Sequence, residues 1–214
     1  MEFPKPYRLA DIALRQLNRS TVRRFDQCRN SLRGFDELNV FKQMTSLYAS
    51  LDKDNKRKFR ELFIARYSEF FPYFAKKPPG EDTLDELVDL YLSGLLTEPN
   101  PLTRYTYDTE VLRKRDRAIE SVNAAPVLSE KDLEFEKAMR YWSQQTGFYI
   151  DIVADDAALM AMKANGVKKV RWITQQDERV CDECKDRNNK VYDIDAVPEK
   201  PHVRCRCYIV PAKD

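Results

Sequence analysis

The stretch that decides the fold of the C-terminal region is 181–207, CDECKDRNNKVYDIDAVPEKPHVRCRC. Its chelating residues are Cys181-x2-Cys184, then, after seventeen further residues, His202-x2-Cys205-x-Cys207. Two residues between ligands let the backbone curl so that both side chains meet one ion, and a second such pair completes a tetrahedron. Cysteine and histidine donors of this kind suit zinc. We therefore expect this segment to fold around one structural zinc ion.

The sequence offers five candidate ligands for four positions. Cys205 is favoured as the fourth ligand because its spacing from His202 repeats that of the first pair. Cys207 stays open as an alternative, since residues two apart on a strand face the same side. Four protein ligands leave no open position for water or substrate, so the site is expected to stabilise the fold and not to catalyse.

Disulfides are the alternative explanation for this cluster. The fifth cysteine, Cys28, stands alone, and we interpret it as a small buried apolar side chain. Residues 1–14 lack a signal-peptide pattern, and no run approaches the roughly 20 apolar residues of a membrane span. We expect neither secretion nor membrane insertion, and in a reducing compartment a dense cysteine cluster is more often a metal site.

The composition, with 43% hydrophobic and 34% charged residues, indicates a globular protein. The fold class we predict is mainly α, with long helices and a small C-terminal zinc-bound β module. Helical periodicity and capping signals predict helices over 8–32, 38–51, 54–74, from Thr83 onward, over 107–125 and from Ser129 to about 165. Gly147 is a candidate kink in the last of these. The expected division is a helical region 1–125, a long helix or helix pair 126–166, and the β module 167–214.

Apolar residues mark the faces that these helices should bury. The first helix places Leu14, Leu17, Phe25, Cys28 and Leu32 on an inner face. The last long helix carries a stripe of Leu133, Ala138, Trp142, Tyr149, Ile152 and Leu159. After Gly166 the pattern becomes strand-like, with expected strands at 167–173, 191–192 and 203–210. Asn188-Asn189 precedes the second strand, where asparagine tolerates a left-handed turn.

A net charge of +2 presents no strong overall field, so any nucleic-acid contact must come from a local patch. Arg15, Arg19 and Arg23 repeat every four residues on one helix face, with Arg24, Arg29 and Arg33 nearby. This arginine stripe is the candidate phosphate contact, and a solvated helix face is an equal alternative. Arg204 and Arg206 flank the ligands; exposed salt bridges are favoured there over contact with an acidic partner or phosphate.

Enzymatic activity is not expected from this sequence, and we expect no catalytic residue and no small-molecule substrate. The single histidine is already assigned to metal, and phosphate-binding glycine loops and Gly-x-Ser-x-Gly elbows are absent. Four acids surround the first cysteine pair: Asp177, Glu178, Asp182 and Glu183. We interpret them as a solvated acidic turn and not as a magnesium or proton-transfer site.

The C-terminal motifs resemble the phage Mu F-like head morphogenesis family. They are Val167-Lys-Lys-Val-Arg-Trp172-Ile-Thr174, Asp177-Glu-Arg-Val-Cys181-Asp-Glu-Cys184, Lys190-Val-Tyr192 and Pro201-His202-Val-Arg-Cys205-Arg-Cys207. Asn189 stands where the family usually has glycine, and Val203 where it typically has proline. The resemblance, which covers roughly 166–211, implies a minor head protein of a tailed phage or prophage.

Such a protein is expected to bind the portal protein, with the major capsid protein and packaged double-stranded DNA as further candidate partners. It would act in capsid assembly, DNA packaging or DNA delivery. It would be located in the virion at the portal vertex, and in the host cytoplasm during assembly. The alternative hypothesis is a zinc-dependent DNA-binding module that uses the arginine stripe. A third is an effector or nuclease built on the acidic turn.

Overall fold

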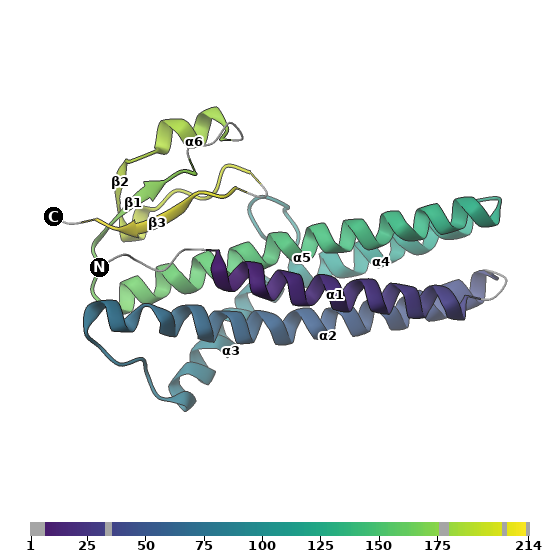
Figure 1. Ribbon diagram of the computed structural model, residues 1–214, viewed down its shortest axis with the longest axis horizontal. Helices are drawn as coiled ribbons and strands as arrows, with labels where there is room; N and C mark the ends of the chain where they lie inside the picture. The colour runs from purple at the N-terminus through teal and green to yellow at the C-terminus, as the bar shows by residue number, and fades with distance from the viewer. Residues whose placement is uncertain (1–6, 33–35, 176–179, 203–204, 213–214) are drawn as a thin grey trace.

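The computed structural model describes residues 7–32, 36–175, 180–202 and 205–212. Long helices make up most of this length, and a small sheet lies at one end of them (Figure 1). The prediction of a mainly helical chain with a small C-terminal strand region is confirmed. Several residues used in the sequence analysis lie outside the described residues: Arg33, Asp177, Glu178, Val203 and Arg204.

The helices are α1 (Arg8–Ser31), α2 (Glu37–Glu69), α3 (Glu81–Thr97), α4 (Tyr107–Ala124), α5 (Leu128–Ala164) and α6 (Asp182–Arg187), with 3-10 turns η1 (Phe71–Phe74) and η2 (Ile194–Ala196). α1, α2, α4 and α5 form an elongated bundle (Figure 1). α2 and α5 pack against each other, and each also packs against α1 and α4. α3 packs against α2 and α4 on the side of this bundle.

The helices expected over 38–51 and 54–74 form one continuous helix, α2, which runs through the polar stretch 52–58. Asn55 lies there but is buried, and its Nδ2 donates a hydrogen bond to Thr146 Oγ1 of α5 at 3.0 Å. The polar residue is therefore satisfied inside the bundle and does not interrupt the helix. α2 ends just before Pro72, which lacks the backbone N–H that a continuing helix needs.

Two predicted N-caps are late, Thr83 by three residues and Ser129 by two. α3 begins at Glu81 after Gly80, so Thr83 lies inside the helix and is not its N-cap. α5 begins at Leu128, so Ser129 is likewise inside it. A capping side chain contributes only about 1 kcal/mol, so packing can make a helix begin a few residues before a predicted N-cap.

α5 is one helix of 37 residues and is not divided at Gly147. A Cβ at Gly147 would lie 3.7 Å from the Leu14 side chain of α1, an ordinary contact distance, so the helix runs through this glycine without a steric need for it. On the predicted stripe, Ala138, Trp142 and Tyr149 are buried, whereas Leu133 is 46% exposed. That part of the prediction is wrong, because position 133 is about 200° around the helix from the buried residue at 135.

Aromatic side chains fill the centre of the bundle. Phe25 of α1 meets Phe135 of α5 edge-on, with ring centroids 5.2 Å apart, and Tyr48 of α2 meets Trp142 in the same way at 5.2 Å. Such pairs add about 0.5–1.5 kcal/mol to the gain from burial. The predicted inner face of α1 is confirmed, with Leu14 partly buried and its other members fully buried.

The C-terminal sheet is antiparallel, in the order β2-β1-β3, with strands β1 (Lys169–Ile173), β2 (Val191–Asp193) and β3 (Tyr208–Pro211). β3 is shorter than predicted and begins only after the last cysteine. Asn189 has φ +65°, so the expected left-handed residue before β2 is present. In Figure 1 this sheet lies beside the C-terminal half of α5. None of the described helices is long and apolar enough to cross a lipid bilayer.

Candidate metal centre

The first pair of candidate ligands is positioned by the start of α6. Cys181 is the N-cap of this helix, and its Sγ accepts a hydrogen bond from the Cys184 backbone N–H at 3.4 Å. The extended backbone of Cys181 and the helical turn that follows bring the two sulfurs to the same side. Cys184 is only 2% exposed, and Arg187 of the same helix stacks on the Trp172 ring of β1, which holds α6 against the sheet.

The second group lies on the irregular segment before β3. The Cys205 backbone N–H donates to the carbonyl of His202 at 3.3 Å, which holds these two residues close together. Cys205 and Cys207 are 2% and 4% exposed, so both point into the module, as expected for residues two apart on an extended chain. The prediction that both lie on a strand is wrong, because β3 starts at Tyr208, one residue after Cys207.

The structure brings all of these donors together around Cys184. Ligand atoms of Cys181, Cys184 and His202 lie within 4.8 Å of one another, and so do those of Cys184, Cys205 and Cys207. The Cys184 Sγ is 3.4 Å from the Cys205 Sγ and 4.0 Å from His202 Nε2. A cavity of about 20 Å³ remains between these side chains. It is comparable with the volume of a single small sphere, so the arrangement is compatible with one bound metal ion.

The protonation of the thiols follows from their surroundings. Burial, and the neighbouring thiols after it, raise the pKa of Cys184, and burial raises that of Cys205. The backbone N–H of Cys184 lowers the pKa of the half-buried Cys181 thiol, because it donates a hydrogen bond to the sulfur. A cation placed among the three would favour their thiolate forms, since a bound metal ion reverses the penalty of burying negative charge.

The ligand segment is tied to the helical bundle by two side chains that sequence reasoning missed. Lys200 Nζ donates to the Cys205 carbonyl at 2.8 Å and forms an ion pair with Asp155 of α5. The Tyr7 hydroxyl, just before α1, donates to the Cys207 carbonyl at 2.7 Å. Both contacts are to backbone atoms, and they fix the path of the chain through the cysteines without competing for the sulfurs.

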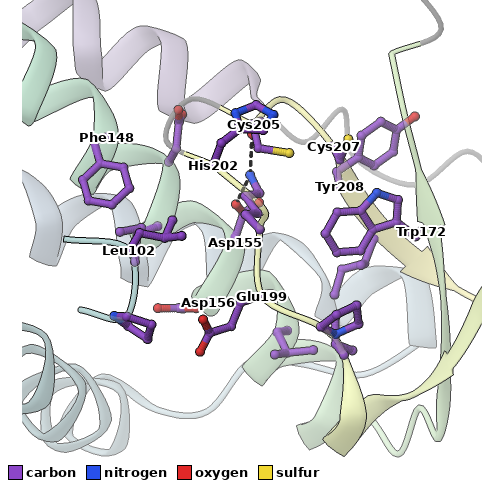
Figure 2. Close-up of a pocket in the computed structure, with 18 of the residues that line it drawn as sticks. Leu102, Phe148, Asp155, Asp156, Trp172, Glu199, His202, Cys205, Cys207 and Tyr208 are labelled. Atoms are coloured by element: carbon purple, nitrogen blue, oxygen red, sulfur yellow. Dashed lines mark hydrogen bonds and ion pairs between the residues drawn. The ribbon is translucent and has the colours of Figure 1, made fainter. Parts of the chain in front are cut away.

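A cavity of about 320 Å³ separates this module from α5 and the α3–α4 connection (Figure 2). Figure 2 shows Phe148 and Leu102 on one side of it, Trp172 and Tyr208 on the other, and Asp155 and Asp156 between them. His202, Cys205 and Cys207 also line it. The cavity therefore reaches the candidate metal ligands from the side of the bundle.

Asp156 is one of two acids lining this cavity whose pKa is raised, the other being Asp155. Burial raises the pKa of Asp156 to about 6, and the neighbouring Asp155 adds to the effect, while the hydrogen bond from the Tyr91 hydroxyl at 2.9 Å opposes it. A half-buried carboxyl that already accepts a hydrogen bond from a tyrosine is satisfied as a structural group. Its raised pKa makes the stability of the fold depend on pH.

The acids beside the first cysteine pair are engaged in ion pairs along α6. Asp182 pairs with Lys185 at 2.9 Å, and Glu183 pairs with Arg187. These are the i,i+3 and i,i+4 pairs of a solvated helix. Asp177 and Glu178, the other two acids of the predicted turn, lie outside the described residues.

The arginine stripe lies on α1, away from the core. Arg15, Arg19 and Arg23 are all exposed, and within the described part of the chain none of them forms an ion pair. Their neighbours Arg24 and Arg29 pair with Asp54 of α2 and Asp132 of α5. Only part of the basic surface is therefore neutralised.

The structure also describes Cys28 and Arg206, the lone cysteine and one of the arginines beside the ligands. Cys28 is 7% exposed, and burial raises the pKa of its thiol to about 11, which agrees with a small apolar side chain of low reactivity. Arg206 is exposed between Cys205 and Cys207, and Gln175 Nε2 donates to its carbonyl at 3.4 Å. Arg204 is outside the described residues.

Comparison of the sequence with known protein families gives a match. The family model described as "Phage Mu protein F like protein" matches residues 112–210. No significant match was found among curated proteins or among solved structures. The match begins well before the motifs quoted from the sequence, since it includes most of α4 and all of α5 as well as the sheet and the cysteine cluster. Over residues 112–210 this chain is therefore similar to the phage Mu F-like family.

Proposed function

We propose that this chain is a minor head protein of a tailed bacteriophage or prophage, which binds the portal vertex and acts in capsid assembly, DNA packaging or DNA delivery. The observation that carries the proposal is the family match over 112–210, which covers the candidate metal centre and the long helices leading to it. The elongated bundle supports it, because long exposed helix faces are suited to docking on large protein assemblies.

We further propose that the candidate metal centre binds zinc as a structural ion. Zinc–sulfur bonds of about 2.3 Å define a tetrahedron with edges of about 3.8 Å. The Cys184 Sγ is 3.4 Å from the Cys205 Sγ, within about 0.4 Å of this edge, and 4.0 Å from His202 Nε2, within about 0.4 Å of the edge of about 3.6 Å that the shorter zinc–nitrogen bond gives. Thiolates and an imidazole are the donors that zinc prefers. When bound, the ion would join α6 to the segment before β3.

The proposed ligands are Cys181, Cys184, His202 and Cys205. The short distance from Cys184 and the hydrogen bond that joins Cys205 to His202 support Cys205 as the fourth ligand. Cys207, the alternative, is equally buried, and its carbonyl is held by Tyr7. Four protein donors close the coordination sphere, which supports a structural role.

Portal binding is tested by co-expressing the chain with the portal protein encoded in the same genome. Size-exclusion chromatography with light scattering should then give one complex of defined stoichiometry. A portal protein from an unrelated phage serves as the control and should not bind. Failure of the cognate pair to associate, with both proteins folded, would refute the proposal.

The second candidate function, DNA binding through the arginine stripe, is favoured by the exposure of Arg15, Arg19 and Arg23 without carboxylate partners in the described structure. Four residues along a helix advance by about 6 Å, so the stripe presents a row of cations along about 12 Å. Duplex DNA binding should then fall steeply with salt. Replacing Arg19 by glutamine should reduce the salt slope by about one, whereas Arg29→Gln on the same helix should change it less, since Arg29 is already paired with Asp132. Absence of binding at low salt would remove this candidate.

A further inference from the structure

A second cavity, of about 280 Å³, lies between α4 and α5 and shares no lining residue with the metal centre or with the cavity beside it. On α4 it is lined by Lys114, Arg117 and Ser121. These positions are three and four residues apart, so they lie on one face of the helix. The face presents two cations and a hydroxyl to the same space.

The polar side chains that line the cavity from α5 are also three and four residues apart. Glu134, Lys137 and Tyr141 line the cavity from this side. Lys137 Nζ forms an ion pair with Glu134, so these two charges largely compensate each other. Tyr141 is 54% exposed and stands at the rim, with Lys114 Nζ 5.6 Å from the centre of its ring.

Small side chains create the space. Ala118 of α4 and Ala138 of α5 are both buried and line the cavity, and Tyr48 of α2 lines it from beneath. A larger residue at either alanine would fill the gap, as side chains do elsewhere in this bundle. The two helices therefore enclose a hollow between two rows of polar side chains.

The cavity has an uncompensated positive charge. Three cations, Lys114, Arg117 and Lys137, face one carboxylate, that of Glu134, which gives a net charge of about +2. Within the described structure neither Lys114 nor Arg117 forms an ion pair. Burial lowers the pKa of Lys114, and the positive charges of Arg113 and Arg117 add to this effect while Glu110 opposes it. An anion in the cavity would relieve this unfavourable arrangement.

We propose that the cavity between α4 and α5 is a binding site for a phosphate group. A phosphate monoanion or dianion matches the charge of the two unpaired cations more closely than one carboxylate does. The lysine acts as a point charge, the arginine supplies a planar set of donors, and the Ser121 hydroxyl adds a neutral donor on the same wall. The phosphate is either a small phosphorylated molecule or the backbone of a nucleic acid. The site is independent of the portal and zinc proposals, since it uses none of their residues.

The proposal is tested by titrating the full-length protein with inorganic phosphate and, separately, with a short duplex DNA, at constant ionic strength in a chloride background. Isothermal titration calorimetry gives the affinity, and amide chemical shifts locate the site. Lys114→Gln and Arg117→Gln should each weaken phosphate binding at least tenfold. Ala118→Leu, which fills the floor without changing charge, should do the same. Lys42→Gln removes an exposed cation from α2, outside the cavity, and should leave the affinity within about twofold.

Comparing inorganic phosphate with duplex DNA shows whether the phosphate group belongs to a small molecule or to a nucleic acid. If the cavity variants weaken phosphate binding but leave DNA binding unchanged, the site takes a small phosphorylated molecule. If they weaken both, DNA phosphates enter the cavity. The proposal is overturned if folded protein binds neither ligand, or if Lys42→Gln has the same effect as the cavity variants. It is also overturned if an oligoglutamate peptide occupies the cavity while phosphate and DNA do not, since the site would then serve an acidic protein partner.

Discussion

Cys184 is the ligand shared by both groups of donors, and we predict that replacing it by alanine weakens metal binding and destabilises the C-terminal module while the bundle stays folded. The module contains little apolar core of its own. Its separate buried cluster consists of Trp172 with three cysteines, whereas Val170 and Ile194 join the core of the bundle. Burial of one tryptophan contributes about 3 kcal/mol, far less than the roughly 10–16 kcal/mol of a structural zinc site.

The expected loss of metal affinity in Cys184→Ala follows from the number of ligands. If about 12 kcal/mol of metal binding is shared among four ligands, loss of one costs about 3 kcal/mol, or about a hundredfold in affinity. Cys28→Ala is the matched control, because it removes the same side chain from a buried position in the bundle. It should cost about 1 kcal/mol of stability and leave metal affinity unchanged.

Competition with a chromophoric chelator measures the affinity, and tryptophan fluorescence measures the local structure. The chain has two tryptophans, so a Trp142→Phe background leaves Trp172 as the reporter of the module. In that background Cys184→Ala should expose Trp172 and preserve the helical circular dichroism signal. A Cys184→Ala protein that keeps its metal with unchanged affinity, or a Cys28→Ala protein that loses it, would refute this reasoning.

Further predictions concern the connections around this site and the bundle. Tyr7→Phe removes the hydrogen bond to the Cys207 carbonyl and should destabilise the module by about 1 kcal/mol, measured as faster amide exchange in β3; an unchanged rate would contradict the role of Tyr7. Asn55→Ala leaves the Thr146 hydroxyl buried without its donor and should lower the free energy of unfolding by about 2 kcal/mol in urea titrations, whereas a neutral effect would show that the pair is dispensable. The pKa of Asp156, raised to about 6 from its ordinary value near 4, means that the folded protein keeps a proton that the unfolded chain has lost between these pH values. Stability should therefore fall as pH rises from about 4 to 6, by on the order of 1–2 kcal/mol, and Asp156→Asn should remove this part of the slope; parallel pH curves for the two proteins would contradict it.

The long helices and the convergence of the chelating residues could be read from the sequence, because both depend on local spacing. Helical periodicity located α1, α4 and α5 closely. The continuity of α2 could not be read in this way, since it depends on Asn55 meeting Thr146, a residue 91 positions away. Local capping signals at Thr83 and Ser129 were likewise overridden by the packing of the whole bundle.

The surroundings of the candidate metal centre were also beyond sequence reasoning. Tyr7 and Cys207 are 200 positions apart, and no local pattern indicates their hydrogen bond. The cavity between α4 and α5 is an intermediate case. The spacing of Lys114, Arg117 and Ser121 is visible in the sequence, but only the fold shows that a second polar face lies opposite and that alanines leave room between them.

The central claim is that a closed metal site joins the two parts of the C-terminal module, and X-ray absorption at the zinc edge of the purified protein tests it most directly. We predict about one zinc per chain, with three sulfur ligands at about 2.3 Å and one nitrogen at about 2.0–2.1 Å. Oxygen ligands in place of sulfur, or folded protein that contains no zinc, would contradict the account.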